Sequence, residues 1–210
     1  MAFQIRISPE VLRAAADRHR AVADAVSNAR EKLGNMYSDL NAAWDGGASN
    51  MALNTLQQFR DAAAQLGEGT NEGAEKLSSI AAAFEALDNE GAIAPIAIVR
   101  KMGHLAALTG IPPRWLIGLK GELRIIPDEV RVIGERSRAL ADEMEQTAHE
   151  LRATLKTLEN SWEGRAYSKF AEETYETING FLKFADHLNE FGSELHRTAA
   201  RYEELDNTLM

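Results

Sequence analysis

A chain of 210 residues with 45% hydrophobic and 26% charged residues has the ordinary balance of a globular protein and can bury a sizeable core. The absence of cysteine excludes a disulfide framework, a thiolate metal site and a cysteine nucleophile. The formal net charge of −9 at pH 7 argues against a nucleic-acid partner.

The first expected helix begins at Ser8-Pro9-Glu10. Serine suits the helix cap, proline the first helical position and an acid the first turn. Apolar residues then recur at steps of three and four up to about Ala43. A helix of this length needs a partner along its side, because isolated helices are marginal in water.

A Trp-x-Gly corner follows at Trp44-Asp45-Gly46. The large ring and a residue that can adopt positive φ, placed between two helical runs, predict the bend of a helical hairpin. The second helix is expected from just after Gly47 to near Asn89. The glycines of residues 67–73 cost up to about 1 kcal/mol each relative to alanine, so we expect a kink or local fraying there.

Residues 91–122 form an apolar and basic connector between two acidic segments. Residues 1–90 carry 8 basic and 13 acidic side chains (−5), residues 91–122 carry 4 and 1 (+3), and residues 123–210 carry 11 and 18 (−7). Prolines and glycines divide the connector, which we expect to form short helices covering a bundle surface. The alternative is a docking or membrane-surface element, for which the candidate residues are Arg100, Lys101 and Trp115.

The third helix is expected to begin at Ile126-Pro127-Asp128 and run to about Ser161. A second corner, Trp162-Glu163-Gly164, leads to a fourth helix from about Ala166 to the C-terminus.

The chain is an internal repeat, since Pro9 and Trp44 recur 118 residues later as Pro127 and Trp162. The apolar stripe recurs at the same spacing: Leu12, Ala15, Val22, Val26, Ala29, Leu33, Met36 and Leu40 match Val130, Ile133, Leu140, Met144, Thr147, Leu151, Thr154 and Leu158. We therefore predict an all-α protein of two hairpins, residues 1–90 and 123–210, pairing antiparallel into a four-helix bundle. The same apolar stripes would be buried if two chains exchanged hairpins to form a swapped dimer.

A hairpin of about ninety residues with Trp-x-Gly at its bend resembles the WXG superfamily. These are the early-secreted-antigen-like proteins exported by type VII (ESX-type) secretion systems. The resemblance covers both hairpins and implies a single-chain equivalent of a WXG dimer. The family's export signal, a C-terminal Tyr-x-x-x-Asp/Glu, is matched by Tyr202 and Asp206. The resemblance places this signal beside Trp44 and Gly46 of the other hairpin.

The first copy carries a degenerate form of this signal, with Phe84 in place of tyrosine and Asp88 as the acid. One functional signal per chain is therefore expected. Without the family context Tyr-x-x-x-Asp is a weak pattern, and Trp44 and Trp162 could simply plug the ends of a bundle.

No pattern of catalytic residues, metal ligands or phosphate-binding glycines stands out, so we expect neither an enzyme nor a cofactor. We expect a substrate of type VII secretion that meets the secretion ATPase, lies in the cytoplasm before export and is secreted or held at the cell surface afterwards. The N-terminus does not resemble a general secretory signal. The alternatives are an adaptor for a larger toxin or a small helical partner, and a membrane-active protein that uses the connector.

Overall fold

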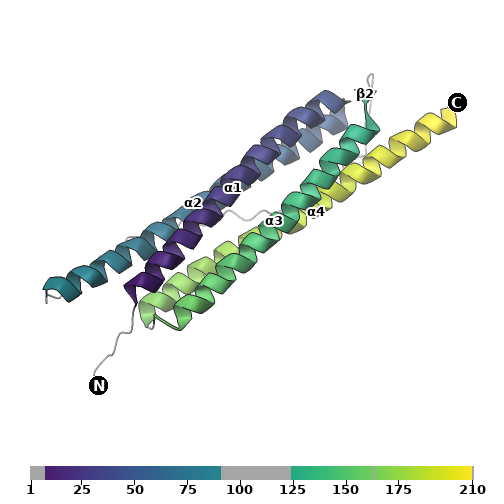
Figure 1. The fold of residues 1–210 in the computed structure, drawn as a ribbon. Helices are drawn as coiled ribbons and strands as arrows, with labels where there is room; N and C mark the ends of the chain where they lie inside the picture. Colours follow the sequence, from purple (N-terminus) through teal and green to yellow (C-terminus); the bar gives the residue numbers. More distant parts are fainter. Residues whose placement is uncertain (1–7, 91–123, 163, 210) are drawn as a thin grey trace. The chain divides into compact units, whose positions relative to one another are not determined.

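The computed structural model describes residues 8–162 and 164–209 except for 91–123, and gives only the backbone of 86–90, 124 and 205–209. The connector candidates Arg100, Lys101 and Trp115 lie outside the described residues. Four long helices and two very short strands make up the described chain (Figure 1). None of these helices combines the length and apolar character that a membrane span requires.

The first hairpin consists of α1 (Pro9–Ala43) and α2 (Gly47–Glu90), joined through β1 (Trp44–Asp45). The Ser8 hydroxyl accepts a hydrogen bond from the Val11 amide at the start of α1, as expected for a helix cap. The second hairpin consists of β2 (Arg124–Ile125), α3 (Pro127–Glu159) and α4 (Arg165–Leu209). The prediction of an all-α fold of two tandem hairpins is confirmed.

The expected local fraying in the second helix was wrong, because α2 runs as one helix through its glycines. The kink stays a prediction. Packing against α1 explains one of these glycines. A side chain at Gly73 would lie 3.1 Å from the His19 ring, and one at Gly67 would lie 3.5 Å from Val26. Gly73 therefore lets the His19 ring approach the backbone of α2, whereas a Cβ at Gly67 would make only an ordinary van der Waals contact and one at Gly69 would meet nothing within 4 Å.

The described chain falls into two compact units, each containing a segment of all four helices. The first unit is built from residues 8–26, 65–90, 146–162 and 164–181. The start of α1 and the end of α2 lie here with the end of α3 and the start of α4. The two hairpins therefore run in opposite directions within this unit.

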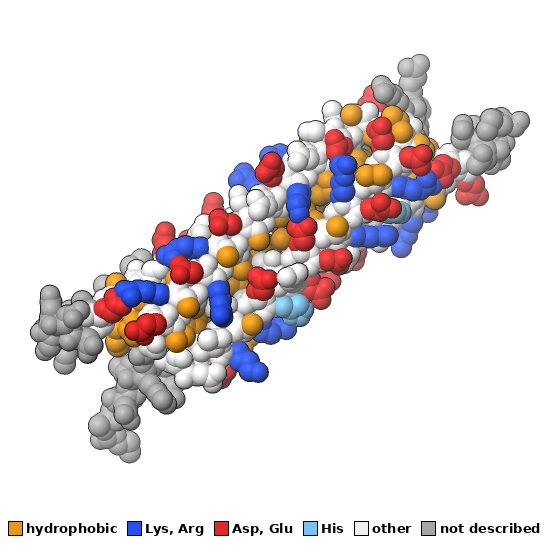
Figure 2. Space-filling model, in the orientation of Figure 1, with side chains coloured by type: hydrophobic (Ala, Val, Ile, Leu, Met, Phe, Trp, Pro, Cys, Tyr) orange, Lys and Arg blue, Asp and Glu red, His pale blue; other side chains and the backbone are white. Residues whose placement is uncertain are grey.

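The second unit is built from residues 27–64, 124–145 and 182–209. It holds the bend of the first hairpin together with the start of α3 and the end of α4. In both units the predicted stripes are buried, and all sixteen stripe residues are at most 5% exposed. Acidic and basic side chains are interspersed over the visible outer face (Figure 2).

The structure repeats at the spacing seen in the sequence. Arg13 pairs with Glu85 in the first hairpin, and Arg131 pairs with Glu203 at the equivalent place in the second. The corner glycines also agree, with φ of 120° at Gly46 and 115° at Gly164. Both hairpins are therefore built on one pattern. The assignment of residues 1–90, 91–122 and 123–210 as separate domains stays a prediction.

Candidate recognition site at the Trp44 corner

The Trp44 corner is tied to the second hairpin through the backbone. Trp44 pairs with Ile125 and Asp45 with Arg124 in a two-stranded antiparallel sheet. The Ile126 amide donates a further hydrogen bond of 2.8 Å to the Ala43 carbonyl. The end of α1 is thereby fixed to the start of α3.

The turn itself depends on glycine at position 46. Its φ of 120° is a conformation that residues with a side chain rarely adopt. The Asp45 carboxylate accepts a 2.8 Å hydrogen bond from the Gly46 amide. The Ser49 hydroxyl donates one of 2.7 Å to the Trp44 carbonyl. These local bonds satisfy backbone groups that the bend would otherwise leave without partners.

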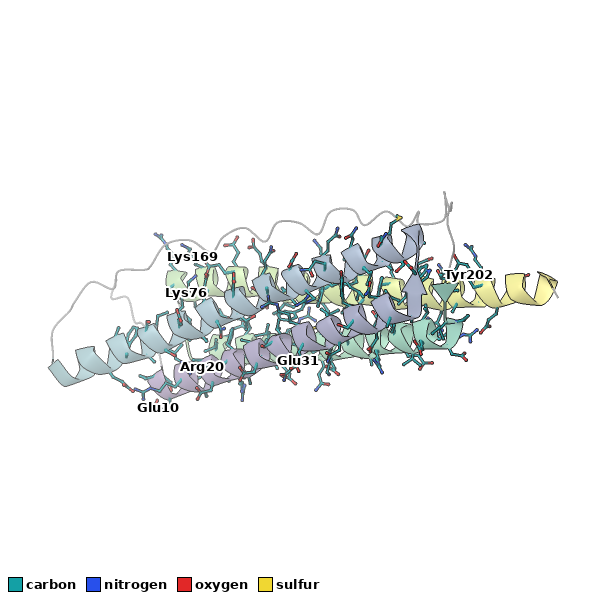
Figure 3. The ribbon with its side chains drawn as sticks, turned by 90° about the horizontal axis from the view of Figure 1, so that it is seen from above. Glu10, Arg20, Glu31, Lys76, Lys169 and Tyr202 are labelled. Atoms are coloured by element: carbon teal, nitrogen blue, oxygen red, sulfur yellow. The ribbon has the colours of Figure 1, made fainter. Side chains whose placement is uncertain are left out.

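Trp44 and Tyr202 meet at this corner, the first from the bend of one hairpin and the second from the end of the other. Their ring centroids are 6.5 Å apart and the planes are inclined at 70°, an edge-to-face arrangement. Trp44 is only 2% exposed, whereas Tyr202 is half-buried. Figure 3 labels Tyr202 on α4. The corner therefore presents part of a tyrosine that is anchored on a buried indole.

A second contact holds the end of α4 against its own hairpin. The Arg131 guanidinium on α3 donates to the Glu203 carboxylate, and this hydrogen bond holds the pKa of Glu203 below its ordinary value. Burial raises the pKa of the Tyr202 hydroxyl, which therefore stays neutral at physiological pH. The described part of the site is thus a neutral phenol next to a paired carboxylate.

The other member of the predicted signal is Asp206. Its side chain lies outside the described residues, but α4 remains helical to Leu209. A residue four positions after Tyr202 on a helix falls on the same face, one turn further on. The backbone therefore aligns positions 202 and 206.

The Trp162 corner is filled differently. Trp162 is also 2% exposed, but its ring packs on Tyr167 and Phe170 of its own hairpin, at centroid distances of 5.7 and 5.6 Å. Gly164 has the same positive φ as Gly46. In the first hairpin the positions of Tyr167 and Phe170 are occupied by Ser49 and Ala52.

The degenerate signal lies at the end of α2. Phe84 is half-buried, and the Asp88 side chain lies outside the described residues. The two corners thus differ in the origin of their aromatic packing. Trp162 is enclosed from within its own hairpin, whereas Trp44 receives Tyr202 from the opposite one.

Sequence reasoning missed several features of the Trp44 corner. The two-residue strands have no periodicity that could reveal them, and the Arg131–Glu203 pair spans 72 residues. The Trp44 indole Nε1 is buried without a hydrogen-bond partner among the described residues, and only the structure reveals this. No group of three or more His, Asp or Glu side chains is placed to hold a metal within the described ranges.

Both hairpins match the same protein family. The family of "Proteins of 100 residues with WXG", WXG100, matches residues 4–89 and again 122–207. Protein YukE of Bacillus subtilis (strain 168) is 28% identical over 90 residues, which is 43% of this chain and 93% of YukE. A single hairpin of this chain thus corresponds to nearly the whole of that relative. No solved structure matches.

Proposed function

Since the chain belongs to the WXG100 family through both of its hairpins, we propose that it is a non-enzymatic substrate of a type VII secretion system. In this proposal the end of α4 at the Trp44 corner is the export signal. Tyr202 and Asp206 supply the tyrosine and the acid, and Trp44 with Gly46 supplies the neighbouring corner. The secretion ATPase is the expected partner, and the culture medium or the cell surface is the destination.

The observation that carries this proposal is the contact between Trp44 and Tyr202. It joins the bend of one hairpin to the C-terminal end of the other, at a centroid distance of 6.5 Å. In a single-hairpin protein such a corner arises only when two chains pair. In this chain both parts belong to one polypeptide, which supports a single-chain equivalent of a WXG dimer.

A matched pair of double variants tests the signal. Tyr202→Ala with Asp206→Ala alters the proposed signal, while Phe84→Ala with Asp88→Ala makes the equivalent change in the degenerate copy. We expect the first variant to remain in the cells and the second to be exported. Circular dichroism should show helical spectra for both. Equal export of the two variants would reject the assignment of the signal.

The adaptor function is the second candidate, and the interspersed charges of the outer face offer sites for polar contacts with a partner. An adaptor should copurify with its client. Native affinity purification of the full chain from cells that express the neighbouring secretion genes provides the measurement. Recovery of the chain alone supports the substrate proposal, and recovery with a stoichiometric toxin or small helical protein supports the adaptor.

A further inference from the structure

We propose that the two hairpins are complementary rather than interchangeable, so that each pairs with the unlike hairpin and rejects a second copy of itself. Several contacts between the hairpins differ in kind from those that repeat-equivalent residues would make in a like pair, whereas the Trp44–Tyr202 ring contact would keep an aromatic counterpart in either like pair. Because the two copies align at one spacing without gaps, this comparison can be made residue by residue.

Two ion pairs between the hairpins depend on unlike partners. Lys32 on α1 contacts Glu143 on α3 at 2.6 Å. The repeat-equivalent of Lys32 is Glu150. Two copies of the second hairpin would therefore place Glu150 against Glu143, two like charges, where the native chain has an ion pair.

An ion pair between α2 and α4 would likewise be replaced by two like charges. Lys76, labelled in Figure 3, contacts Glu173 at 2.8 Å, and the two side chains are only 26% and 20% exposed. The equivalent of Lys76 is Glu194. Pairing of the second hairpin with itself would thus create a second repulsive contact, and two-fold symmetry would double both.

The first hairpin is prevented from self-pairing by its core rather than by its charges. Phe59 on α2 packs edge to face on Phe184 and Phe191 of α4, at centroid distances of 5.7 and 5.6 Å. The equivalents of those two rings in the first hairpin are Leu66 and Gly73. A pair of first hairpins would leave Phe59 facing a leucine and an empty glycine position.

A second aromatic contact would also be lost in a like pair. The His19 ring lies 5.8 Å from the Phe170 ring across the hairpin interface. Phe170 corresponds to Ala52, and His19 corresponds to Ser137. Neither like pairing reproduces the ring contact. A third ion pair, Arg136 with Asp39, is the exception, because a pair of first hairpins would place Arg18 near Asp39.

These contacts also define the partner that the second hairpin accepts. It must carry cations at the positions of Lys32 and Lys76 and a large aromatic ring at the position of Phe59. Specificity of this kind arises from attraction to the right partner together with repulsion of the wrong one. Any dimer of this chain is therefore expected to form by exchange of unlike hairpins.

The test uses the full chain with a protease recognition sequence placed in residues 91–122. The folded chain is cleaved, unfolded in urea and refolded by dilution, and native mass spectrometry counts the pairs. We expect unlike pairs to exceed like pairs by about tenfold or more, whereas unselective association gives equal numbers of like and unlike pairs. Numbers close to equality, or an excess of either like pair, would overturn the proposal.

Two charge variants sharpen the result. Glu150→Lys with Glu194→Lys removes the predicted repulsion and should raise the share of second-hairpin pairs at least several-fold. Glu172→Lys with Glu176→Lys makes the same change in net charge at exposed positions of α4. This control should leave the share unchanged, and an equal rise in both variants would contradict the assigned contacts.

The intact chain gives an independent readout that requires no reassembly. Lys32→Glu with Lys76→Glu introduces the second hairpin's charges into the native interface and should lower the urea midpoint. Adding Glu143→Lys and Glu173→Lys in the same chain should restore it. A fourfold variant no more stable than the double variant would show that these pairs do not select the partner.

Discussion

Trp44 and Tyr202 pack edge to face although they belong to different hairpins, and the tyrosine is the partly exposed member of the pair. The aromatic ring and the hydroxyl of Tyr202 therefore have separable roles. The ring packs on a buried indole, and we expect the hydroxyl to contribute to recognition.

Substitutions at Tyr202 should separate these roles. Tyr202→Phe keeps the ring and should leave the free energy of unfolding nearly unchanged, whereas Tyr202→Ala should lower it by about 1–3 kcal/mol because the packing on Trp44 is lost. Urea unfolding followed by circular dichroism provides the measurement. Tyr175→Ala is the control, since Tyr175 is 49% exposed on the same helix. An equal loss in the control would contradict the role of the ring contact.

The corner glycines should tolerate substitution much less well than their neighbour. Gly46→Ala and Gly164→Ala force a side chain into positive φ and should each cost roughly 1–3 kcal/mol. Gly47→Ala places a methyl group in the first turn of α2 with nothing within 4 Å. It should be neutral or should stabilise by up to about 1 kcal/mol. Thermal unfolding measures the stability of the three variants. A Gly46→Ala protein as stable as the Gly47→Ala protein would show that position 46 does not require glycine.

Gly73 and His19 should behave as a coupled pair. A Cβ at position 73 would lie 3.1 Å from the His19 ring, so the ring must shift, and Gly73→Ala should gain less than the roughly 1 kcal/mol that alanine ordinarily contributes over glycine within a helix. His19→Ser copies the residue found at the equivalent Ser137 and removes the ring. The double variant should therefore be more stable than the sum of the two single changes predicts. Strict additivity in a double-mutant cycle would show that the two positions are independent.

Acid should weaken the chain partly through His19. This residue is 2% exposed, its Nδ1 lies 2.9 Å from the Ala15 carbonyl, and its Nε2 has no hydrogen-bond partner in the part of the chain that the structure describes. Burial lowers its pKa below the ordinary value of 6.5, an effect that the Ala15 hydrogen bond opposes. Below pH 6.5 the unfolded chain therefore binds more protons than the folded one, and stability falls until the folded pKa is reached.

His19→Gln should reduce the loss of stability between pH 7.5 and pH 5. Urea midpoints at the two pH values provide the measurement. His149→Gln is the matched control, because His149 is exposed on α3. The pKa of His196 is also lowered, chiefly by burial. Both variants keep His196, so both should retain part of the loss of stability in acid. A wild-type midpoint that rises on acidification would contradict this sign.

The repeat made most of the fold predictable from sequence. Pro9 and Pro127 mark two helix starts, and the shared stripe identifies the buried face of each hairpin. Trp-x-Gly located both bends, because a helix can reverse only where the backbone is free to leave helical dihedral angles. Local propensity was the weaker guide. The glycines of α2 predicted a kink or local fraying, but α2 is continuous through them.

Predictability was lower for contacts that depend on three-dimensional pairing. The proximity of Tyr202 to Trp44 was expected from the family resemblance and not from spacing. The β1–β2 pairing and the ion pair between Lys76 and Glu173 have no signal along the chain, because their partners are remote in sequence. The His19–Phe170 contact also becomes visible only once the hairpins are placed together.

Export by a type VII secretion system can be measured as the amount of full-length chain in the culture medium and on the cell surface. The measurement compares cells whose type VII secretion ATPase is intact with cells in which its ATP-binding site is inactivated, using a cytoplasmic protein to control for lysis. We expect the chain in the medium or on the cell surface of the first culture and only inside the cells of the second. Equal exported amounts in the two cultures, or no exported chain in either, would contradict export by this route.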